Sequence, residues 1–192
     1  MLPAILTILL ISSLTLLPAG GCPADTAGRS PSHIYFKAQY AGNLGFASVG
    51  AGSKFFNDKL SLDLNYGYMP EFINGTEVHT IALKPAFHFK EFVISGFKAG
   101  FYIGTALNYN ITSNTYIKFP GYYPEGYYVP NALHANPFLG AKTFLPARKL
   151  SCISLYTELG TVEYKILCAI KNRKIEFDEI WNLCFGIVFH LK

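Results

Sequence analysis

A strict two-residue alternation of apolar and polar side chains recurs along this chain and limits what it can fold into. In residues 59–69, KLSLDLNYGYM, leucine or tyrosine occupies every second position from Leu60 to Tyr68, and polar residues or glycine occupy the positions between them. Because successive side chains of a β-strand point to opposite faces, this pattern predicts a strand with one apolar and one polar face. In a soluble protein the polar face meets the solvent, whereas in a membrane barrel the apolar face meets lipid.

The alternation predicts eight strands. They span residues 33–41, 45–55, 59–69, 77–89, 96–109, 136–145, 151–161 and 180–191. Segments of this length can cross a bilayer as tilted strands, and after residue 20 no apolar run approaches the ~18 residues that a spanning helix needs. We therefore predict an all-β fold, an eight-stranded antiparallel up-and-down transmembrane β-barrel.

The connections between these segments alternate in length. Residues 55–58, 90–92 and 146–149 are short turns, whereas residues 69–76, 110–135 and 162–179 are longer. Short periplasmic turns and longer extracellular loops are typical of outer-membrane barrels, so we expect long third and fourth extracellular loops. The short stretch GNL at 42–44 is the exception on the long-loop side.

Glycine and aromatic residues predict which face points outward. Glycines fall on the polar side of the alternation: Gly50, Gly52, Gly67, Gly96, Gly100, Gly104, Gly140 and Gly186. An eight-stranded barrel has a crowded interior, so small residues favour the polar face as the inner one. Aromatic residues end the apolar face at both rims, as in a membrane girdle. The girdle residues are Tyr40, Tyr66, Tyr68, Tyr109 and Trp181 toward the long loops, and Phe55, Phe89 and Phe189 toward the short turns. The alternative is a soluble lipocalin-like carrier, whose apolar face would surround a ligand.

The N-terminus has the layout of a secretory signal peptide. Residues 1–24 combine an apolar run with small residues, and cleavage is expected near 21–24. A short segment, 25–32, then leads into the barrel at 33–192. The stretch AGGC loosely resembles a lipobox, which leaves lipidation of Cys22 as an alternative to a plain cleaved signal. We expect the protein in the outer membrane of a Gram-negative cell.

With these segments in place, residues 33–191 resemble the small eight-stranded outer-membrane barrels of bacteria, the group that includes OmpX-like, PagP-like and PagL-like proteins. The ending FGIVFHLK has the alternating aromatic residues of their closing strands, although it finishes in Lys192. The resemblance implies a cell-envelope barrel, porin-like in its alternation. It also implies a second function, because some of these barrels are lipid A acyltransferases or deacylases that use His, Ser and an acidic residue.

Charged residues on the inner face are expected to pair inside the barrel. The predicted lumenal ionic cluster is Lys37, Asp63, Lys84, Lys98 and Glu158. Because an unpaired buried charge is costly, an ionic plug is the first interpretation, and a basic lumen that attracts an anion is the second.

The longest loop is rich in tyrosine, glycine and proline. Tyr122, Tyr123, Tyr127 and Tyr128 form a hypothetical docking surface for an extracellular glycan, a lipid headgroup or a protein; the alternative is an aromatic lid. Residues 163–173 predict a short helix whose basic neighbours would meet lipopolysaccharide headgroups. The expected partners are therefore the lipid bilayer and lipopolysaccharide.

Catalytic and metal-binding signatures are weak. Candidates for acyl transfer, His79, His134, Glu158, Ser113 and Ser154, are scattered along the chain, so no catalytic residue is assigned. Irregularly spaced cysteines predict no metal or cofactor, although a bridge between Cys168 and Cys184 stays open. Lysines that alternate along strands do not predict nucleic-acid binding. We therefore predict a non-enzymatic outer-membrane barrel with a structural or surface-binding, adhesion-type role, with a lipid A-modifying acyl hydrolase or acyltransferase as the alternative.

Overall fold

The computed structural model of this protein describes residues 33–94, 97–113, 115–116, 132–145, 153–171 and 180–191. The predicted signal peptide, the segment 25–32 and the four loop tyrosines lie outside the described residues. The described strands are β1 (Ile34–Ala41), β2 (Ala47–Phe55), β3 (Leu60–Met69), β4 (Val78–His88), β5 (Phe92–Ile94), β6 (Phe97–Ile111), β7 (Leu133–Leu145), β8 (Ile153–Gly160) and β9 (Asn182–His190). The described helices are α2 (Glu71–Asn74) and α3 (Glu163–Lys171).

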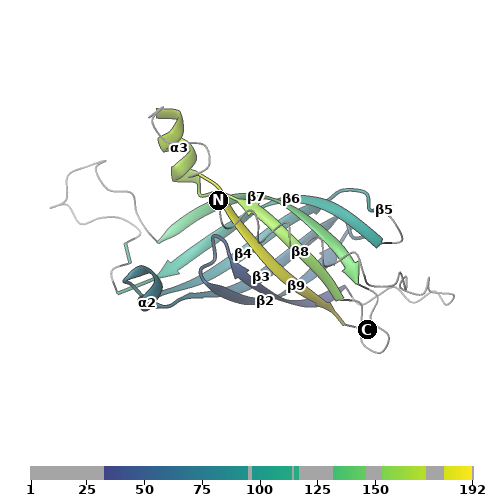
Figure 1. Ribbon diagram of the computed structural model, residues 1–192, viewed down its shortest axis with the longest axis horizontal. Helices are drawn as coiled ribbons and strands as arrows, with labels where there is room; N and C mark the ends of the chain where they lie inside the picture. Colours follow the sequence, from purple (N-terminus) through teal and green to yellow (C-terminus); the bar gives the residue numbers. More distant parts are fainter. Residues whose placement is uncertain are drawn as a thin grey trace.

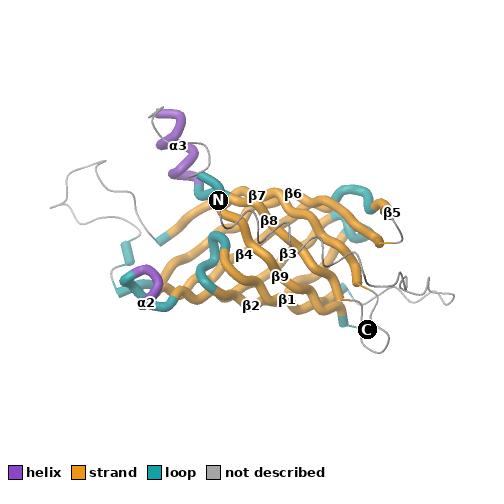
Figure 2. The backbone as a smooth tube through the Cα atoms, in the orientation of Figure 1, coloured by secondary structure: helices purple, strands orange, loops and turns teal. Residues whose placement is uncertain are grey.

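The strands form one closed antiparallel sheet. Strands that follow one another in the chain pair, except that β4 pairs with β6 and not with β5. β1 also pairs with β9, so the sheet closes on itself. The short β5 continues the line of β4, because both pair with β6 at successive heights. Because β4 and β5 occupy one strand position in the wall, the nine strands form an eight-stranded barrel. This confirms the predicted eight-stranded antiparallel up-and-down β-barrel. Figures 1 and 2 show the strands running at an angle to the long axis of the barrel, with α2 and α3 at one end and β5 at the other.

Most strand limits shift by one or two residues from the prediction, and two differences are larger. Residues 90–92 are not simply a turn, because Phe92 begins β5 and pairs with Ala99. The sequence Phe92-Val93-Ile94 is aromatic and β-branched and extends the hairpin beyond the rim. β7 also begins earlier, at Leu133, because it pairs with β6 as far as Tyr109. The described residues contain no helix long and apolar enough to cross a bilayer.

The polar face of the alternation points into the barrel. In β3, Asp63 and Asn65 are buried, whereas Leu62, Leu64 and Tyr66 are exposed on the outer surface. The same alternation holds in β1, where Lys37 is 6% exposed and its neighbour Phe36 is 51% exposed. The lumen is therefore polar, which contradicts the soluble carrier alternative with its apolar interior.

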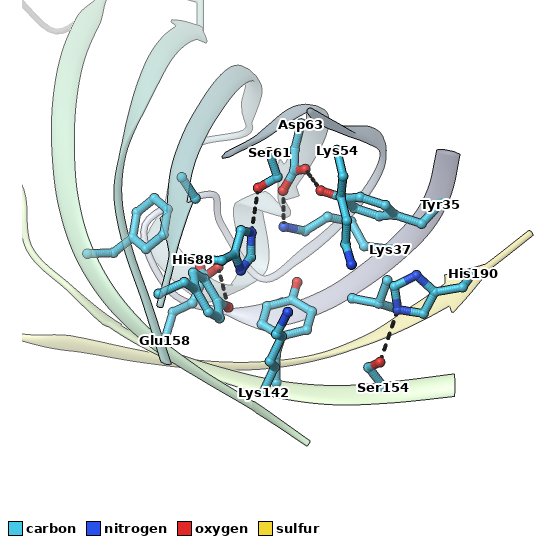
Figure 3. Close-up of a pocket in the computed structure, with 15 residues that line it drawn as sticks. Tyr35, Lys37, Lys54, Ser61, Asp63, His88, Lys142, Ser154, Glu158 and His190 are labelled. Carbon is cyan, nitrogen blue, oxygen red and sulfur yellow. Dashed lines mark hydrogen bonds and ion pairs between the residues drawn. The ribbon is translucent and has the colours of Figure 1, made fainter. Parts of the chain in front are cut away.

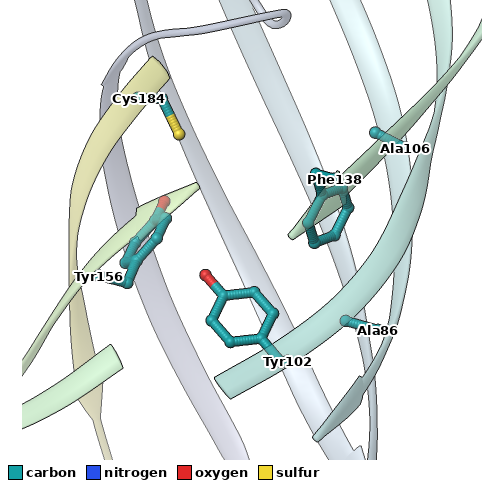
Figure 4. Close-up of a cluster of buried hydrophobic side chains, with 6 residues drawn as sticks. All are labelled: Ala86, Tyr102, Ala106, Phe138, Tyr156 and Cys184. Carbon is teal, nitrogen blue, oxygen red and sulfur yellow. The ribbon is translucent and has the colours of Figure 1, made fainter. Parts of the chain in front are cut away.

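Interior aromatic rings pack over glycines of the adjacent strand. The cross-strand pairs are Tyr35 with Gly52, Tyr102 with Gly140, Phe138 with Gly104 and Tyr156 with Gly186. A Cβ atom at any of the four glycines would lie within 3.0 Å of the ring, closer than real Cβ contacts. The glycines therefore make room for rings that fill the barrel. Figure 4 shows three of these rings, Tyr102, Phe138 and Tyr156, projecting into one interior space near Cys184.

Candidate functional site

Two buried ion pairs lie inside the barrel, near the middle of their strands. Lys37 Nζ is 2.6 Å from Asp63 Oδ2, and Lys84 Nζ is 2.6 Å from Glu158 Oε2. All four side chains are at most 7% exposed. Because desolvating a charge costs several kcal/mol, each of these groups needs the partner that it has. The first pair joins β1 to β3, and the second joins β4 to β8, so the second connects the two halves of the chain.

Tyrosine hydroxyls satisfy the remaining carboxylate oxygens. Tyr35 donates a hydrogen bond to Asp63 Oδ1, and Tyr102 donates to Glu158 Oε1 at 3.0 Å. Cys184 Sγ lies 3.6 Å from Glu158 Oε2. Both carboxylates are therefore held by a cation and a neutral donor together, the arrangement that a buried anion requires.

Gln39 connects the two ion pairs. Its Oε1 accepts hydrogen bonds from Tyr156 at 3.2 Å and from Lys84 at 3.4 Å. The Lys37 ammonium lies 4.9 Å from the centre of the Tyr156 ring, so Tyr156 bridges Lys37 to Gln39. We call the connected residues the lumenal plug. The lumenal plug is Tyr35, Lys37, Gln39, Asp63, Lys84, Tyr102, Tyr156 and Glu158.

Small cavities lie on the two sides of the lumenal plug. The one toward the long loops has about 20 Å³ of space for the centres of water molecules, and the one toward the short turns has about 40 Å³. Phe138 and Glu158 border both cavities. Space of this size holds a few water molecules, so the described residues pack the interior around water-sized gaps.

The turn between β1 and β2 closes the long-loop end of the lumen. Leu44 in this turn is 2% exposed. Asn43 donates to the Thr161 carbonyl at 3.2 Å, and its own carbonyl accepts from Asn108 at 3.0 Å. Asn182 also donates to the Asn43 side chain. Because these partners come from β6, β9 and the end of β8, the turn folds inward across the mouth.

The cavity toward the short turns is lined by basic and imidazole groups. Lys54 of β2 and Lys142 of β7 line it together with His88 of β4 and His190 of β9. Figure 3 shows the Lys54 and Lys142 ammonium groups pointing toward the same space from different strands, with an imidazole on either side. His88 Nε2 is 2.8 Å from Ser61 Oγ, and His190 Nε2 is 3.0 Å from Ser154 Oγ. We call this space the basic cavity.

Glu91, between β4 and β5, binds two lysines at the rim beyond the basic cavity. Its carboxylate is 2.9 Å from Lys142 Nζ and also pairs with Lys98. Partial burial disfavours the charged form, but the hydrogen bonds and positive charges of the two lysines outweigh it and lower the pKa of Glu91 to about 2. Glu91 therefore stays ionised at neutral pH.

The structure brings together four of the five residues predicted for the ionic cluster. Lys37, Asp63, Lys84 and Glu158 belong to the lumenal plug, whereas Lys98 lies at the rim with Glu91, and its side chain is 58% exposed. Lys98 differs because its part of β6 pairs only with β5 and β7 beyond the closed wall. The predicted girdle residues Tyr40, Tyr66, Tyr68, Tyr109, Trp181 and Phe189 all lie exposed on the outer face.

Of the residues considered for acyl transfer, Ser154 and Glu158 line the same cavity, but neither candidate histidine, His79 or His134, lines it with them. Ser154 lies in the interior with His190, and Glu158 belongs to the plug. His134 pairs instead with Glu163 of α3 at 2.9 Å. Cys168 and Cys184 are both free, the first exposed on α3 and the second buried in the lumen, so the bridge left open by the sequence is absent. The described residues contain no cluster of three or more His, Cys, Asp or Glu side chains that could hold a metal ion.

Sequence reasoning missed the neutral half of the site. Tyr35, Tyr102, Tyr156 and Gln39 carry the hydrogen bonds of the lumenal plug, and His88 and His190 line the basic cavity. A usable signal was present, because each of these tyrosines lies on the polar face of its strand and pairs with a glycine across the sheet. That pairing depends on register, which the sequence alone did not fix.

No protein-family model and no curated protein matches this chain. Among solved structures, the chain is similar to the de novo designed protein TMB2.3, determined by solution NMR. The match has 10% sequence identity and a TM-score of 0.41, and it covers 86% of this chain and 99% of the designed one. The strand pairing described above establishes the barrel independently of this likeness.

Proposed function

We propose that this protein spans the outer membrane as a barrel with a sealed lumen, and that its role is structural or surface-binding and not enzymatic. The observation that supports this proposal is that the apolar face of the barrel wall points outward and the charged face points inward, the reverse of a soluble protein. In the described strands, the outward positions carry no Asp, Glu, Lys or Arg, whereas two ion pairs are buried inside. In water, a continuous apolar exterior of this kind would drive association, so a lipid surround is its natural environment.

The dimensions of the apolar exterior fit a bilayer. β3 has 10 residues. At about 3.3 Å per residue, such a strand is about 33 Å long, and a tilt of about 40° leaves a height of about 25 Å, the height of the apolar band in outer-membrane barrels. Outward-facing Tyr66 and Tyr109 lie in one register row across β3, β4 and β6, through Ile81. This row supports an aromatic girdle at the long-loop rim.

The packed interior argues for a sealed barrel. The lumenal plug fills the centre, and the inward-folded turn at residues 42–44 covers one mouth. Ion conduction would require both to open.

The loop tyrosines Tyr122, Tyr123, Tyr127 and Tyr128 remain our proposed contact surface for a glycan or protein. Deleting residues 119–130 should abolish such binding while the barrel still folds, and loss of the barrel itself would contradict a separate docking loop.

The single tryptophan allows a direct test of membrane insertion. Trp181 precedes β9 and is exposed on the outer face near the long-loop rim. In vesicles with brominated lipids, bromines near the carbonyl region should quench its fluorescence more strongly than bromines near the chain ends. The matched control is Trp181→Phe combined with Leu64→Trp, because Leu64 lies at the middle of β3 and should show the opposite depth order.

Two outcomes of the quenching test, and one outcome of a separate conductance measurement, are informative. Quenching with the two opposite depth orders supports a spanning barrel. Absence of quenching at both positions, in protein that has the circular dichroism spectrum of a folded barrel, contradicts insertion. Stepwise conductance of the wild-type protein in planar bilayers would contradict the sealed lumen while leaving insertion intact.

A further inference from the structure

The basic cavity holds two lysine side chains that are nearly removed from solvent. The side chain of Lys54 is 13% exposed and that of Lys142 is 9% exposed. Their ammonium groups point into the same space in Figure 3, and each adds an unfavourable charge interaction with the other. Two like charges that converge in a partly dry space need a negative partner between them.

The carboxylates of the protein do not supply that partner inside the cavity. Among the described lining residues, Asp63 and Glu158 are already bound to Lys37 and Lys84 at 2.6 Å. The acids nearest to Lys54 and Lys142 are Asp58 and Glu91, and neither lines the cavity.

These outer acids balance only part of the charge. Asp58 is 3.8 Å from Lys54 and half exposed, and Glu91 divides its carboxylate between Lys142 and Lys98. Three lysines at this mouth therefore share two carboxylates. Each ammonium has three N–H donors, so donors of Lys54 and Lys142 remain available toward the cavity.

Neutral donors complete the lining. Ser61 with His88, and Ser154 with His190, form two hydroxyl–imidazole pairs on the cavity wall. His88 Nδ1 is buried and has no hydrogen-bond partner among the described residues. A hydroxyl can rotate and an imidazole can change tautomer, so both pairs can present a donor to an anion. The cavity thus combines cations with polarised neutral groups, as oxyanion sites do.

We propose that the basic cavity binds a small tetrahedral oxyanion, of the size and charge of inorganic phosphate. Its volume, about 40 Å³ for the centres of water molecules, suits a group that replaces a few waters and is too small for a sugar or a nucleotide. The lumenal plug and the turn at 42–44 close the other direction. The anion therefore enters from the short-turn mouth. This site gives a small ligand to a barrel whose proposed role is structural or surface-binding.

Isothermal titration of the full mature protein with sodium phosphate tests this site. The protein is refolded in an uncharged maltoside detergent at pH 7 and low ionic strength, so that no lipid or detergent phosphate competes. We expect saturable binding at one site per chain, competition by sulfate, and only weak competition by chloride at equal ionic strength. Lys54→Met or Lys142→Met should weaken binding at least about tenfold, the effect of losing one charge-assisted hydrogen bond.

Matched controls come from the same rim. Lys59→Met and Lys90→Met remove the same charge from exposed positions that do not line the cavity, so they should leave the affinity within about twofold. A second measurement needs no variant: phosphate should protect Lys54 and Lys142 from acetylation in the wild-type protein, but not Lys59 or Lys90. Absence of saturable binding, equal weakening by all four substitutions, or uniform protection of all four lysines would each overturn the proposal.

Discussion

Breaking the ion pair between Lys84 and Glu158 should cost a large part of the stability of the barrel. Lys84→Met keeps an unbranched side chain that can still pack on the Phe138 ring, where the ammonium now lies 4.6 Å from the ring centre. It leaves Glu158, 5% exposed, with the Tyr102 hydroxyl at 3.0 Å as its main donor. Loss of one partner from a buried ion pair typically costs about 3–5 kcal/mol in the free energy of unfolding.

The reverse substitution should cost a similar amount. Glu158→Gln leaves Lys84, which is 2% exposed, with Gln39 Oε1 at 3.4 Å as the acceptor for its ammonium group. The double variant removes both charges, so the penalty of an unpaired buried charge disappears. We expect it to be more stable than either single variant, with a coupling energy of at least about 3 kcal/mol between the two positions.

Urea unfolding in lipid vesicles, followed by Trp181 fluorescence, measures these free energies. The control cycle uses Lys98→Met and Glu91→Gln at the rim, where the lysine side chain is 58% exposed. Coupling there should stay below about 1 kcal/mol, because water screens an exposed pair. If the interior substitutions prove additive, or if Lys84→Met unfolds at the same urea concentration as wild type, then the charges are not held in a dry plug and do not seal the lumen.

Three further predictions follow from the packing, the rim and the cysteines. Gly140→Ala should lower the free energy of unfolding by about 1–3 kcal/mol because its Cβ meets the Tyr102 ring, whereas Gly100→Ala, which meets the flexible Glu91 side chain, should cost less; equal losses in urea unfolding would contradict the ring-over-glycine packing. The pKa of Glu91 is lowered from its ordinary 4.5 to about 2, so its contribution to the free energy of unfolding is full above pH 4.5 and is lost as the pH falls toward 2. In acid titrations the stability difference between wild type and Glu91→Gln should therefore shrink over that window. A constant difference would refute this. In a background with Cys22→Ser and Cys152→Ser, a membrane-impermeant maleimide should label exposed Cys168 but not buried Cys184 until the barrel is unfolded. Labelling of both in the folded protein would exclude the packed lumen.

The alternation of side chains was sufficient to predict the barrel, because successive side chains point to opposite faces along the whole length of every strand. It also predicted which face turns inward, since Asp63 and Lys84 need partners and Gly140 and Gly186 need crowded surroundings. The hydrogen-bonding tyrosines of the plug were not predicted. The alternation places Tyr102 and Tyr156 on the inner face, but only the register that sets them opposite Gly140 and Gly186 shows where their rings pack.

The basic cavity was missed for a related reason. His88 and His190 lie 102 positions apart in sequence and belong to different strands, and each looks like an isolated histidine near a strand end. Only closure of the sheet brings them to the same mouth. Similarly, the short GNL connection stood out by its length, but its inward fold depends on partners from distant strands, and a length pattern contains no information about them.

The docking of Asn43 has a consequence for the order of assembly. This residue belongs to the first hairpin, yet its partners Asn108, Thr161 and Asn182 belong to β6 or to the last third of the chain. The hairpin can therefore form early, but its tip can seat only when the terminal strands have joined. Docking of this turn would stabilise the barrel after β1 has paired with β9. Protection of the Asn43 side chain or of the neighbouring amides in a refolding time course would therefore report when the barrel closes.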